Sequence, residues 1–288
     1  MGWEGSGQVD DDLGDVLRHL NRHSRQAQRQ LANHPLTRAY LEAGMRLLAE
    51  EFFPKPADED DRPQHRSFLR ISRDQVIKEV AHGPDDLPHQ GNPGSLRDRW
   101  PYFSDYLGDL ILYALRIDRF GGHLELAEQA ADAIGDDTLS LAAHEIAYRD
   151  LNLKIDDTAT RFHFLVTAFA DHDPVVAKAL SAVYEELTES WRQVYEKIFQ
   201  SRGLRLRPGL SLDEFTLIIT AVAEGLALRA QGDRSTAVLD HKRRRSLLGT
   251  AALALMIAFV DPGDGQTLED IADRVANSQA GPPPAPAT

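Results

Sequence analysis

Apolar residues recur at helical spacing along most of this chain. The clearest stretch runs from Leu36 to Phe53, where apolar side chains return every three or four residues, as on one face of an amphipathic helix. Strand signals are scarce, because alternating runs of Val, Ile and Thr are few and no Asn-Gly or Asp-Gly turn joins two apolar strands. The pattern therefore predicts an all-α fold.

Three capping signals indicate where helices begin. Ser72 is followed three residues later by Gln75, and Ser211 by Glu214, which is the arrangement of a capping box. Asn92 precedes a proline at the first helical position, another common start. Together with the periodicity, these signals predict helices over 9–33, 36–53, 72–81, 93–100, 102–117, 123–134, 138–151, 155–170, 174–202, 212–231, 243–260 and 267–277.

The longest uncharged apolar stretch is too short to cross a membrane. It runs for fifteen residues from Ser246 to Val260 and follows the basic run Lys242–Arg245. A membrane-spanning helix needs about 20 such residues. We interpret the stretch as a helix buried in a core or a subunit interface. A membrane anchor is the alternative, since positive flanks help to orient spans.

The absence of cysteine removes several classes of chemistry. With no Cys in 288 residues, disulfides, thiolate metal sites, iron–sulfur ligation and cysteine nucleophiles are excluded. The N-terminal sequence has no basic stretch followed by an apolar core, so we expect no secretory signal. We therefore expect a cytoplasmic protein.

The sequence contains no recognisable catalytic motif. It has no P-loop, no Gly-x-Ser-x-Gly elbow and no Gly-x-Gly-x-x-Gly turn. His163 and His172 are nine residues apart and His82 and His89 seven apart, whereas two ligands on one helical face need a spacing of four. We expect no enzymatic activity, no cofactor and no metal. An all-α enzyme with a carboxylate acid–base pair stays open as an alternative.

The net charge of −13 is unevenly distributed. Residues 1–120 carry 16 Lys and Arg against 20 Asp and Glu, whereas the remaining 168 residues carry 16 against 25. DNA binding depends on the local footprint of charge and not on its sum. The acidic excess is therefore compatible with DNA binding by the N-terminal part.

Three successive predicted helices, the second and third of them short, suggest a helix-turn-helix. Leu36–Phe53 is the amphipathic support, Ser72–Ala81 starts at a small hydroxyl residue, and Gly94–Trp100 reads Gly-Ser-Leu-Arg-Asp-Arg-Trp. This order is similar to that of TetR-type transcriptional regulators, whose third helix carries a Gly-Thr-Leu-Tyr-x-x-Phe type sequence. Tyr102–Leu107 fits the start of the fourth helix of that family.

The chain departs from the family pattern in this region. The connections at 54–70 and 82–92 are longer than those of the family. Arg97 stands in place of a usual tyrosine, and Asp98 follows it. A helical ligand-binding or partner-binding protein of TetR-like architecture that no longer binds DNA is therefore a second reading.

The second half also resembles TetR-type proteins. Asp173–Arg202 resembles the long helix of the ligand domain, Ser211–Gln231 the penultimate helix, and 246–260 the last major helix. In the family the last two helices pair with their copies in a second chain as a four-helix bundle. The resemblance therefore implies a homodimer formed by helices 212–231 and 243–260, both of which are nearly apolar all round.

The resemblance implies six DNA-binding residues. Arginine can contact guanine O6 and N7 at once, and serine can reach a base or a phosphate oxygen. We expect the third helix to contact bases and the second to contact the DNA backbone. The predicted base readers are Ser95, Arg97 and Arg99, and the predicted backbone contacts are Ser72, Arg73 and Lys78.

Aromatic and polar residues of the middle helices are candidates for a ligand pocket. Effector sites between helices have apolar walls and a few polar groups. Core packing is the alternative interpretation for the aromatic residues. The predicted ligand-binding residues are Tyr113, Phe120, His144, Tyr148, Arg161, Phe164 and Trp191.

The sequence as a whole predicts a TetR-like DNA-binding regulator, a repressor whose DNA affinity changes when a small, largely apolar ligand binds. We expect double-stranded DNA, a small effector and a second copy of the chain as partners, and no membrane. The predicted organisation is a helical arm over 1–35, a helix-turn-helix domain with a linking helix over 36–117, a ligand-binding and dimerisation domain over 118–277, and a disordered tail over 278–288.

Overall fold

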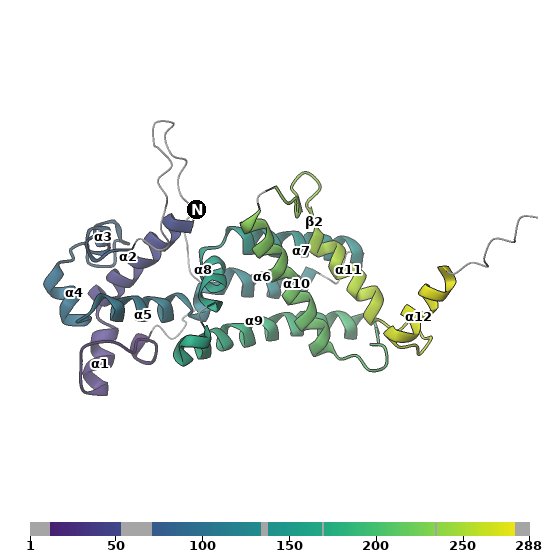
Figure 1. Cartoon of the computed structure of the whole chain (residues 1–288), viewed down its shortest axis with the longest axis horizontal. Helices are drawn as coiled ribbons and strands as arrows, with labels where there is room; N and C mark the ends of the chain where they lie inside the picture. Colours follow the sequence, from purple (N-terminus) through teal and green to yellow (C-terminus); the bar gives the residue numbers. More distant parts are fainter. Residues whose placement is uncertain (1–11, 53–70, 134–137, 169, 234, 280–288) are drawn as a thin grey trace, which may run out of the picture. The chain divides into compact units, whose positions relative to one another are not determined.

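The computed structural model describes residues 12–52, 71–133, 138–168, 170–233 and 235–279. Within these residues the chain forms twelve α-helices, four short 3-10 helices and two strands of two residues each (Figure 1). The predicted all-α fold is confirmed. The predicted loop at 54–67 and the residues of the predicted tail from 280 onward lie outside the described residues.

The chain divides into two compact units, each with its own core. One unit comprises Met1–Phe120 and Asp157–Val183, and the other comprises Gly121–Asp156 and Tyr184–Thr288. The expected boundary at 117/118 lies close to the division at Phe120. The expected single domain over 118–277 differs from the structure, because helix α8 and the first part of α9 pack with the N-terminal unit.

The N-terminal unit is built from short helices around two longer ones. Its elements are η1 (Leu13–Asp15), α1 (Arg25–Ala32), α2 (Pro35–Phe52), α3 (Arg73–Glu79), η2 (Val80–His82), α4 (Pro93–Arg99), α5 (Phe103–Ala114), η3 (Ile117–Phe120), α8 (Thr158–Thr167), η4 (Ala170–His172) and the start of α9 (Pro174–Ser201). Helix α3 begins with the predicted capping box, at Ser72 with Gln75, and α4 begins at the predicted N-cap Asn92, where Ser95 completes a further capping box.

Three aromatic rings join α2, the end of α4 and α5. Trp100 lies edge-on to Tyr40 of α2, with ring centroids 6.3 Å apart, and edge-on to Tyr106 of α5, at 5.2 Å. All three side chains are buried. Gly44 lets the two long helices approach, because a Cβ at this position would collide with the Tyr106 hydroxyl and with Leu110. Each edge-on ring pair contributes about 0.5–1.5 kcal/mol beyond the area it buries.

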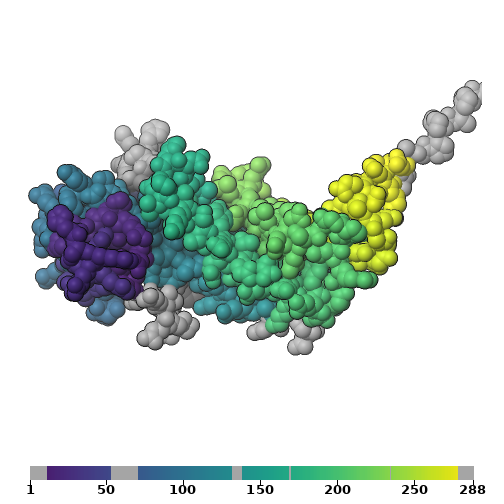
Figure 2. Space-filling model, turned by 90° about the horizontal axis from the view of Figure 1, so that it is seen from below, coloured from purple at the N-terminus to yellow at the C-terminus, as the bar shows by residue number. Residues whose placement is uncertain are grey.

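The N-terminal segment is folded onto its unit, contrary to the predicted single helix over 9–33. The described part begins with η1, continues without regular structure and forms a helix only from Arg25. Leu13, Leu17 and Leu20 are buried in the core. Figure 2 shows this segment in purple as a continuous part of the surface of the unit. Residues 12–35 are therefore part of the N-terminal core and not an exposed arm.

Asp109 of α5 fixes this segment in place. Its Oδ1 accepts hydrogen bonds from the backbone N–H groups of Arg18 at 2.7 Å and His19 at 3.1 Å, and its Oδ2 accepts one from Trp100 Nε1 at 2.8 Å. The carboxylate is buried. Its three donors satisfy it, as a buried charge requires.

The C-terminal unit is centred on α7. Its elements are α6 (Gly121–Ala133), α7 (Leu139–Asp156), the rest of α9, α10 (Leu212–Gly232), β1 (Leu239–Asp240), β2 (Arg245–Ser246), α11 (Leu247–Phe259) and α12 (Leu268–Gln279). Helices α7, α10 and α11 pack against one another (Figure 1). Among the described residues, no helix combines the length and the apolar character needed to cross a membrane.

The helix predicted over 243–260 begins four residues later than expected. Leu239 pairs with Ser246 and Asp240 with Arg245 in a small antiparallel hairpin. Ser246 then caps α11 by accepting the Gly249 N–H at 3.1 Å. The basic run Lys242–Arg245 lies in this hairpin, so α11 contains no charged residue.

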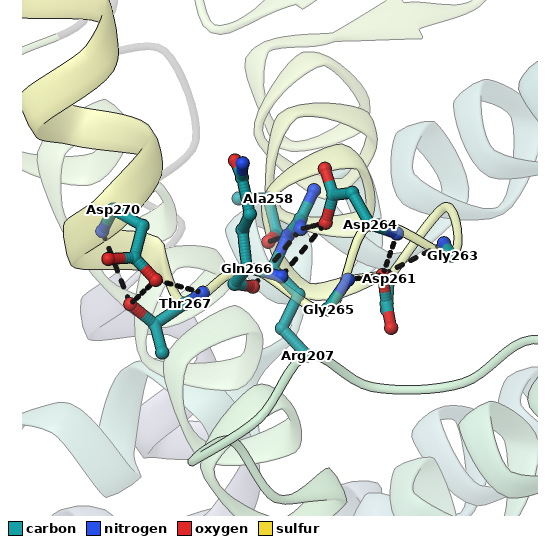
Figure 3. Close-up of polar contacts among 9 residues, drawn as sticks. All are labelled: Arg207, Ala258, Asp261, Gly263, Asp264, Gly265, Gln266, Thr267 and Asp270. Carbon is teal, nitrogen blue, oxygen red and sulfur yellow. Dashed lines mark hydrogen bonds and ion pairs between the residues drawn. The ribbon is translucent and has the colours of Figure 1, made fainter.

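Arg207 holds the chain where α11 ends (Figure 3). Its buried guanidinium donates to the Ala258 carbonyl at 2.9 Å, to Asp264 Oδ1 at 2.9 Å and to the Gln266 carbonyl at 3.3 Å. Each acceptor lies more than fifty residues away in the sequence. This arginine therefore fixes the connection between α11 and α12.

The Asp261 carboxylate also shapes the connection between α11 and α12 (Figure 3). Asp261 Oδ1 accepts the N–H groups of Gly263 at 2.8 Å and Gly265 at 3.2 Å. Both glycines have a positive φ, a conformation that residues with a side chain rarely adopt. Thr267 then accepts the Asp270 N–H at 3.2 Å, so the predicted cap of the last helix is confirmed.

We expect Asp109→Asn to destabilise the fold by about 2–4 kcal/mol, because an amide can accept at only one of the two positions and hydrogen bonds to a charged group contribute about 1.5–3 kcal/mol each. The free energy of unfolding, measured by urea titration, tests this. Asp74→Asn, the same change at an exposed position of α3, is the control and should stay within about 0.5 kcal/mol of wild type. Equal effects of the two substitutions would contradict the anchoring role of Asp109.

Candidate nucleic-acid interface and ligand cavities

Helix α3 presents its predicted DNA-backbone residues at the surface. Ser72 is exposed and caps the helix, Lys78 is exposed, and Arg73 is half-buried. Helix α3 packs against both α2 and α4. The three residues therefore lie on an element that also contacts the helix with the predicted base readers.

The Ser95 side chain is engaged in hydrogen bonds within the protein. Its Oγ lies 2.6 Å from the Tyr40 hydroxyl, and it completes the capping box with Asn92, whose Oδ1 accepts the Ser95 N–H at 2.8 Å. The Tyr40 hydroxyl also accepts the Asn92 N–H at 3.0 Å. Ser95 therefore ties the start of α4 to α2. Neither its capping role nor its tyrosine partner was predicted from the sequence.

Arg97 is the exposed arginine of α4. Within the described residues it makes no hydrogen bond or ion pair. The neighbouring Asp98 forms an exposed ion pair with Arg22 at 2.8 Å, and Arg22 also donates to the Asp98 carbonyl at 3.2 Å. Arg22 therefore offsets part of the negative charge that Asp98 places beside Arg97.

Arg99 is buried, so the prediction that it contacts DNA bases is corrected. Only 5% of the residue is exposed. Its guanidinium donates to Thr37 Oγ1 at 3.0 Å and to the Ser95 carbonyl at 2.9 Å, and it lies 3.2 Å from His34 Nδ1. Burial lowers the pKa of His34, and the Arg99 charge lowers it further. Arg99 therefore joins α4 to α2 and to the end of α1.

The sequence contained a signal for the burial of Arg99. Leu96 and Trp100 are both buried, and Arg99 stands three residues after one and directly before the other. Positions 96, 99 and 100 share one face of a helix, whereas 97 faces away from it. Helical spacing alone could therefore have separated the two arginines.

Four of the seven predicted ligand residues lie in the N-terminal unit and take part in its packing. Tyr113 is buried and donates to Glu42 at 2.5 Å. Phe120 is buried edge-on to His163, and His163 stacks on Phe164. Arg161 donates to the Phe52 carbonyl at 2.9 Å.

A half-buried charge pair lies beside Tyr113. The guanidinium of Arg119 lies 4.5 Å from the centre of the Tyr113 ring and forms an ion pair with Glu42. Burial alone would raise the pKa of Glu42, but Arg119 and the Tyr113 hydroxyl hold it below its ordinary value. The charges in this cluster already satisfy one another.

The other three predicted ligand residues lie in the C-terminal unit. The Tyr148 hydroxyl lies 2.9 Å from His241 Nδ1, His144 packs against Gly249, and Trp191 lines an enclosed cavity. The seven residues are thus divided between two units, and the predicted single ligand pocket is not formed by them.

The cavity beside Trp191 is small and has one charged end. It has a volume of about 70 Å³ and lies between α7, α9, α10 and α11. Asp150 and Lys154 of α7 form a buried ion pair there, and Gln231 donates to the Lys154 carbonyl at 3.1 Å. Burial raises the pKa of the nearby Glu224. Ligand sites are usually about 300–1,000 Å³, so this space is too small for a typical effector.

A polar groove of about 440 Å³ lies near the Tyr148 side of α7. Its two arginines are already paired, because Arg149 donates to Gln129 at 2.5 Å and Arg244 to Glu145 at 2.9 Å. A ligand would have to break these hydrogen bonds before it could form its own with either arginine.

A third cavity, of about 310 Å³, lies in the N-terminal unit between α2, α5, α8 and the start of α9. Its walls are apolar, and the polar residues His172 and Asp173 stand at one end. None of the seven predicted ligand residues lines it.

Helices α10 and α11 expose apolar side chains although they pack against each other. Four exposed residues of α10 follow one another at helical spacing: Leu217, Ala221, Gly225 and Leu228. Leu247, Thr250, Ala254 and Ile257 do the same on α11. We call these eight residues the α10/α11 face.

No group of three or more His, Asp or Glu side chains that could hold a metal ion occurs in the part of the chain that the structure describes. Comparison of the chain with family models, curated proteins and solved structures found no match.

The two arginines of α4 should differ sharply in their effect on stability. Arg99→Ala removes a buried group with three partners and should cost about 2–4 kcal/mol of unfolding free energy. Arg97→Ala, on the exposed side of the same helix, should stay within about 0.5 kcal/mol of wild type. Chemical denaturation of both variants checks this, and a similar loss in both would show that Arg97 is also structural.

Proposed function

We propose that this protein is a dimeric DNA-binding regulator of the TetR type that contacts double-stranded DNA through α3 and α4. The observation that carries the proposal is the placement of Arg97, which is exposed and forms no hydrogen bond or ion pair within the described residues. It lies on a short helix whose opposite face is held to α2 by Arg99 and Ser95. A base-reading arginine needs both a free guanidinium and a rigid support. Arg97 has both.

The rest of the α3–α4 surface supports the same role. Lys78 is exposed and Arg73 partly so, and neither forms an ion pair within the described residues. Phosphate contacts by Lys and Arg position a protein on DNA, and base contacts specify the sequence. We assign Lys78, Arg73 and Ser72 to the DNA backbone and Arg97 to the bases.

The proposed regulator is a cytoplasmic repressor whose DNA affinity responds to a small apolar effector. A ligand can shift such an equilibrium only if it binds one conformation more tightly than the other. The apolar cavity of the N-terminal unit is the candidate site for it.

A second function has a specific observation in its favour. Of the three predicted base readers, Arg99 is buried and Ser95 is held by Tyr40, so Arg97 alone is free. A helical ligand-binding or partner-binding protein of this architecture without DNA binding would show the same arrangement. DNA selection separates the two functions.

DNA binding can be tested without a known operator. Duplexes selected from a randomised pool by the wild-type protein should bind Arg97→Ala more weakly by about 1–3 kcal/mol, roughly 5- to 150-fold, because a two-point contact with guanine is lost. Fluorescence anisotropy at fixed salt gives the affinities. Arg25→Ala removes another exposed arginine, on α1, and should bind as wild type does. Failure to select any sequence would favour the second function.

The α10/α11 face supports the dimer. Apart from Glu224, the stretch from Phe215 to Leu228 carries no charge, and α11 carries none. Contiguous exposed apolar surface on a soluble protein marks an interaction site. We propose that a second copy covers this face, so that α10 and α11 of two chains form a four-helix bundle.

Ile257→Asp tests the dimer. Ile257 is 75% exposed on α11, so an aspartate there leaves the fold of one chain intact but places an unpaired charge in the interface. We expect a wild-type dimer and a monomeric variant in sedimentation velocity at micromolar concentration. Val275→Asp, on α12, is the control and should stay dimeric. A wild-type monomer, or an Ile257→Asp dimer, would contradict the assignment.

A further inference from the structure

The apolar cavity of the N-terminal unit has the size of a small-molecule site. Its volume of about 310 Å³ is roughly twice that of an engineered apolar cavity of about 150 Å³ that stays dry and takes up benzene. It is the one of the three cavities described above that combines ligand-sized space with an apolar wall. A molecule with two rings fits this volume.

The walls of this cavity offer dispersion contacts and little else. Leu48, Leu107, Ile111, Phe162, Leu165 and Val176 line it. They come from α2, α5, α8 and α9, all within one unit. Burial of apolar surface contributes about 25 cal/mol per Å², so an apolar guest gains free energy without any specific polar contact.

The carboxylates at the mouth of this cavity, where the exposed His172 and Asp173 lie, disfavour an anionic guest. The Asp173 side chain is engaged as the cap of α9, because its Oδ1 accepts the N–H groups of Val175 at 2.9 Å and Val176 at 3.3 Å. Its charge and that of the neighbouring exposed Asp171 oppose an anion. No wall residue beyond the mouth could neutralise a charge of either sign.

We propose that this cavity binds a small, uncharged, two-ring-sized apolar molecule, held by α5 and α8. The role of such a molecule as the effector rests on the proposed function. Its binding to the cavity does not rest on that function, because binding can be measured without DNA.

Two dyes that differ in one charged group test the proposal. 1-Naphthylamine is neutral and its fluorescence shifts to shorter wavelength when it enters an apolar site, and 5-amino-1-naphthalenesulfonate has the same two rings with a sulfonate added. We expect saturable binding of the neutral dye at one molecule per chain, at least tenfold tighter than that of the sulfonate. Equal affinities, or no saturable binding of the neutral dye, would overturn the proposal.

Variants that fill the cavity locate the dye. Leu165→Trp and Ile111→Phe each place extra atoms in the empty space. Two variants are used so that a folding defect in one of them does not decide the test. With the fold verified by circular dichroism, each should weaken binding of the neutral dye at least tenfold and remove the rise in melting temperature that the dye gives to wild type.

Two controls address the other apolar sites of the chain. Ile257→Asp alters the α10/α11 face, and Ala252→Leu fills part of the cavity beside Trp191. Both should bind the neutral dye as wild type does. Loss of binding in either control, with binding kept in the filled variants, would place the dye elsewhere and overturn the proposal. DNA binding is measured separately, so its failure would remove the regulatory role and leave the dye result unchanged.

Discussion

The N-terminal unit depends on the contacts that one tyrosine of α2 makes with α4 and α5. The Tyr40 ring packs against Trp100, its hydroxyl meets Asn92 and Ser95 at the start of α4, and its carbonyl accepts the Tyr106 hydroxyl of α5 at 2.9 Å. A helix of seven residues is too short to be stable alone, since most helical stability comes from tertiary packing. Helix α4 therefore exists because Tyr40 and its neighbours hold it.

The polar residues of the N-terminal unit fall into two groups. Asp109 and Arg99 are buried and fully engaged, and each joins segments that are distant in the sequence. Arg97 and Lys78 are exposed and unengaged within the described residues. The first group gives the surface its rigidity, and the second gives it the charge that a nucleic acid would recognise. The proposed DNA contact requires both.

The C-terminal unit combines an enclosed core with an uncovered face. Helices α10 and α11 contribute Phe215, Ile219 and Leu248 to the interior, while Leu217 and Ile257 point to solvent. The buried Asp150–Lys154 pair lies at the cavity on the inner side. Helices that are apolar on both sides usually have the outer side covered, which is why we propose a second chain as the partner.

The sequence by itself determined the helical class and several helix starts, because capping boxes such as Ser72 with Gln75 and helical periodicity are local properties. It also showed that α10 and α11 are apolar all round. The tertiary structure alone decided that Arg99 is buried, since its partner Thr37 lies 62 residues away, and that residues 12–24 pack on the core through Asp109. It also decided that the residues expected in one pocket belong to two units, and that other residues line the apolar cavity of the N-terminal unit. Such contacts depend on which faces meet in space, and no local pattern records that.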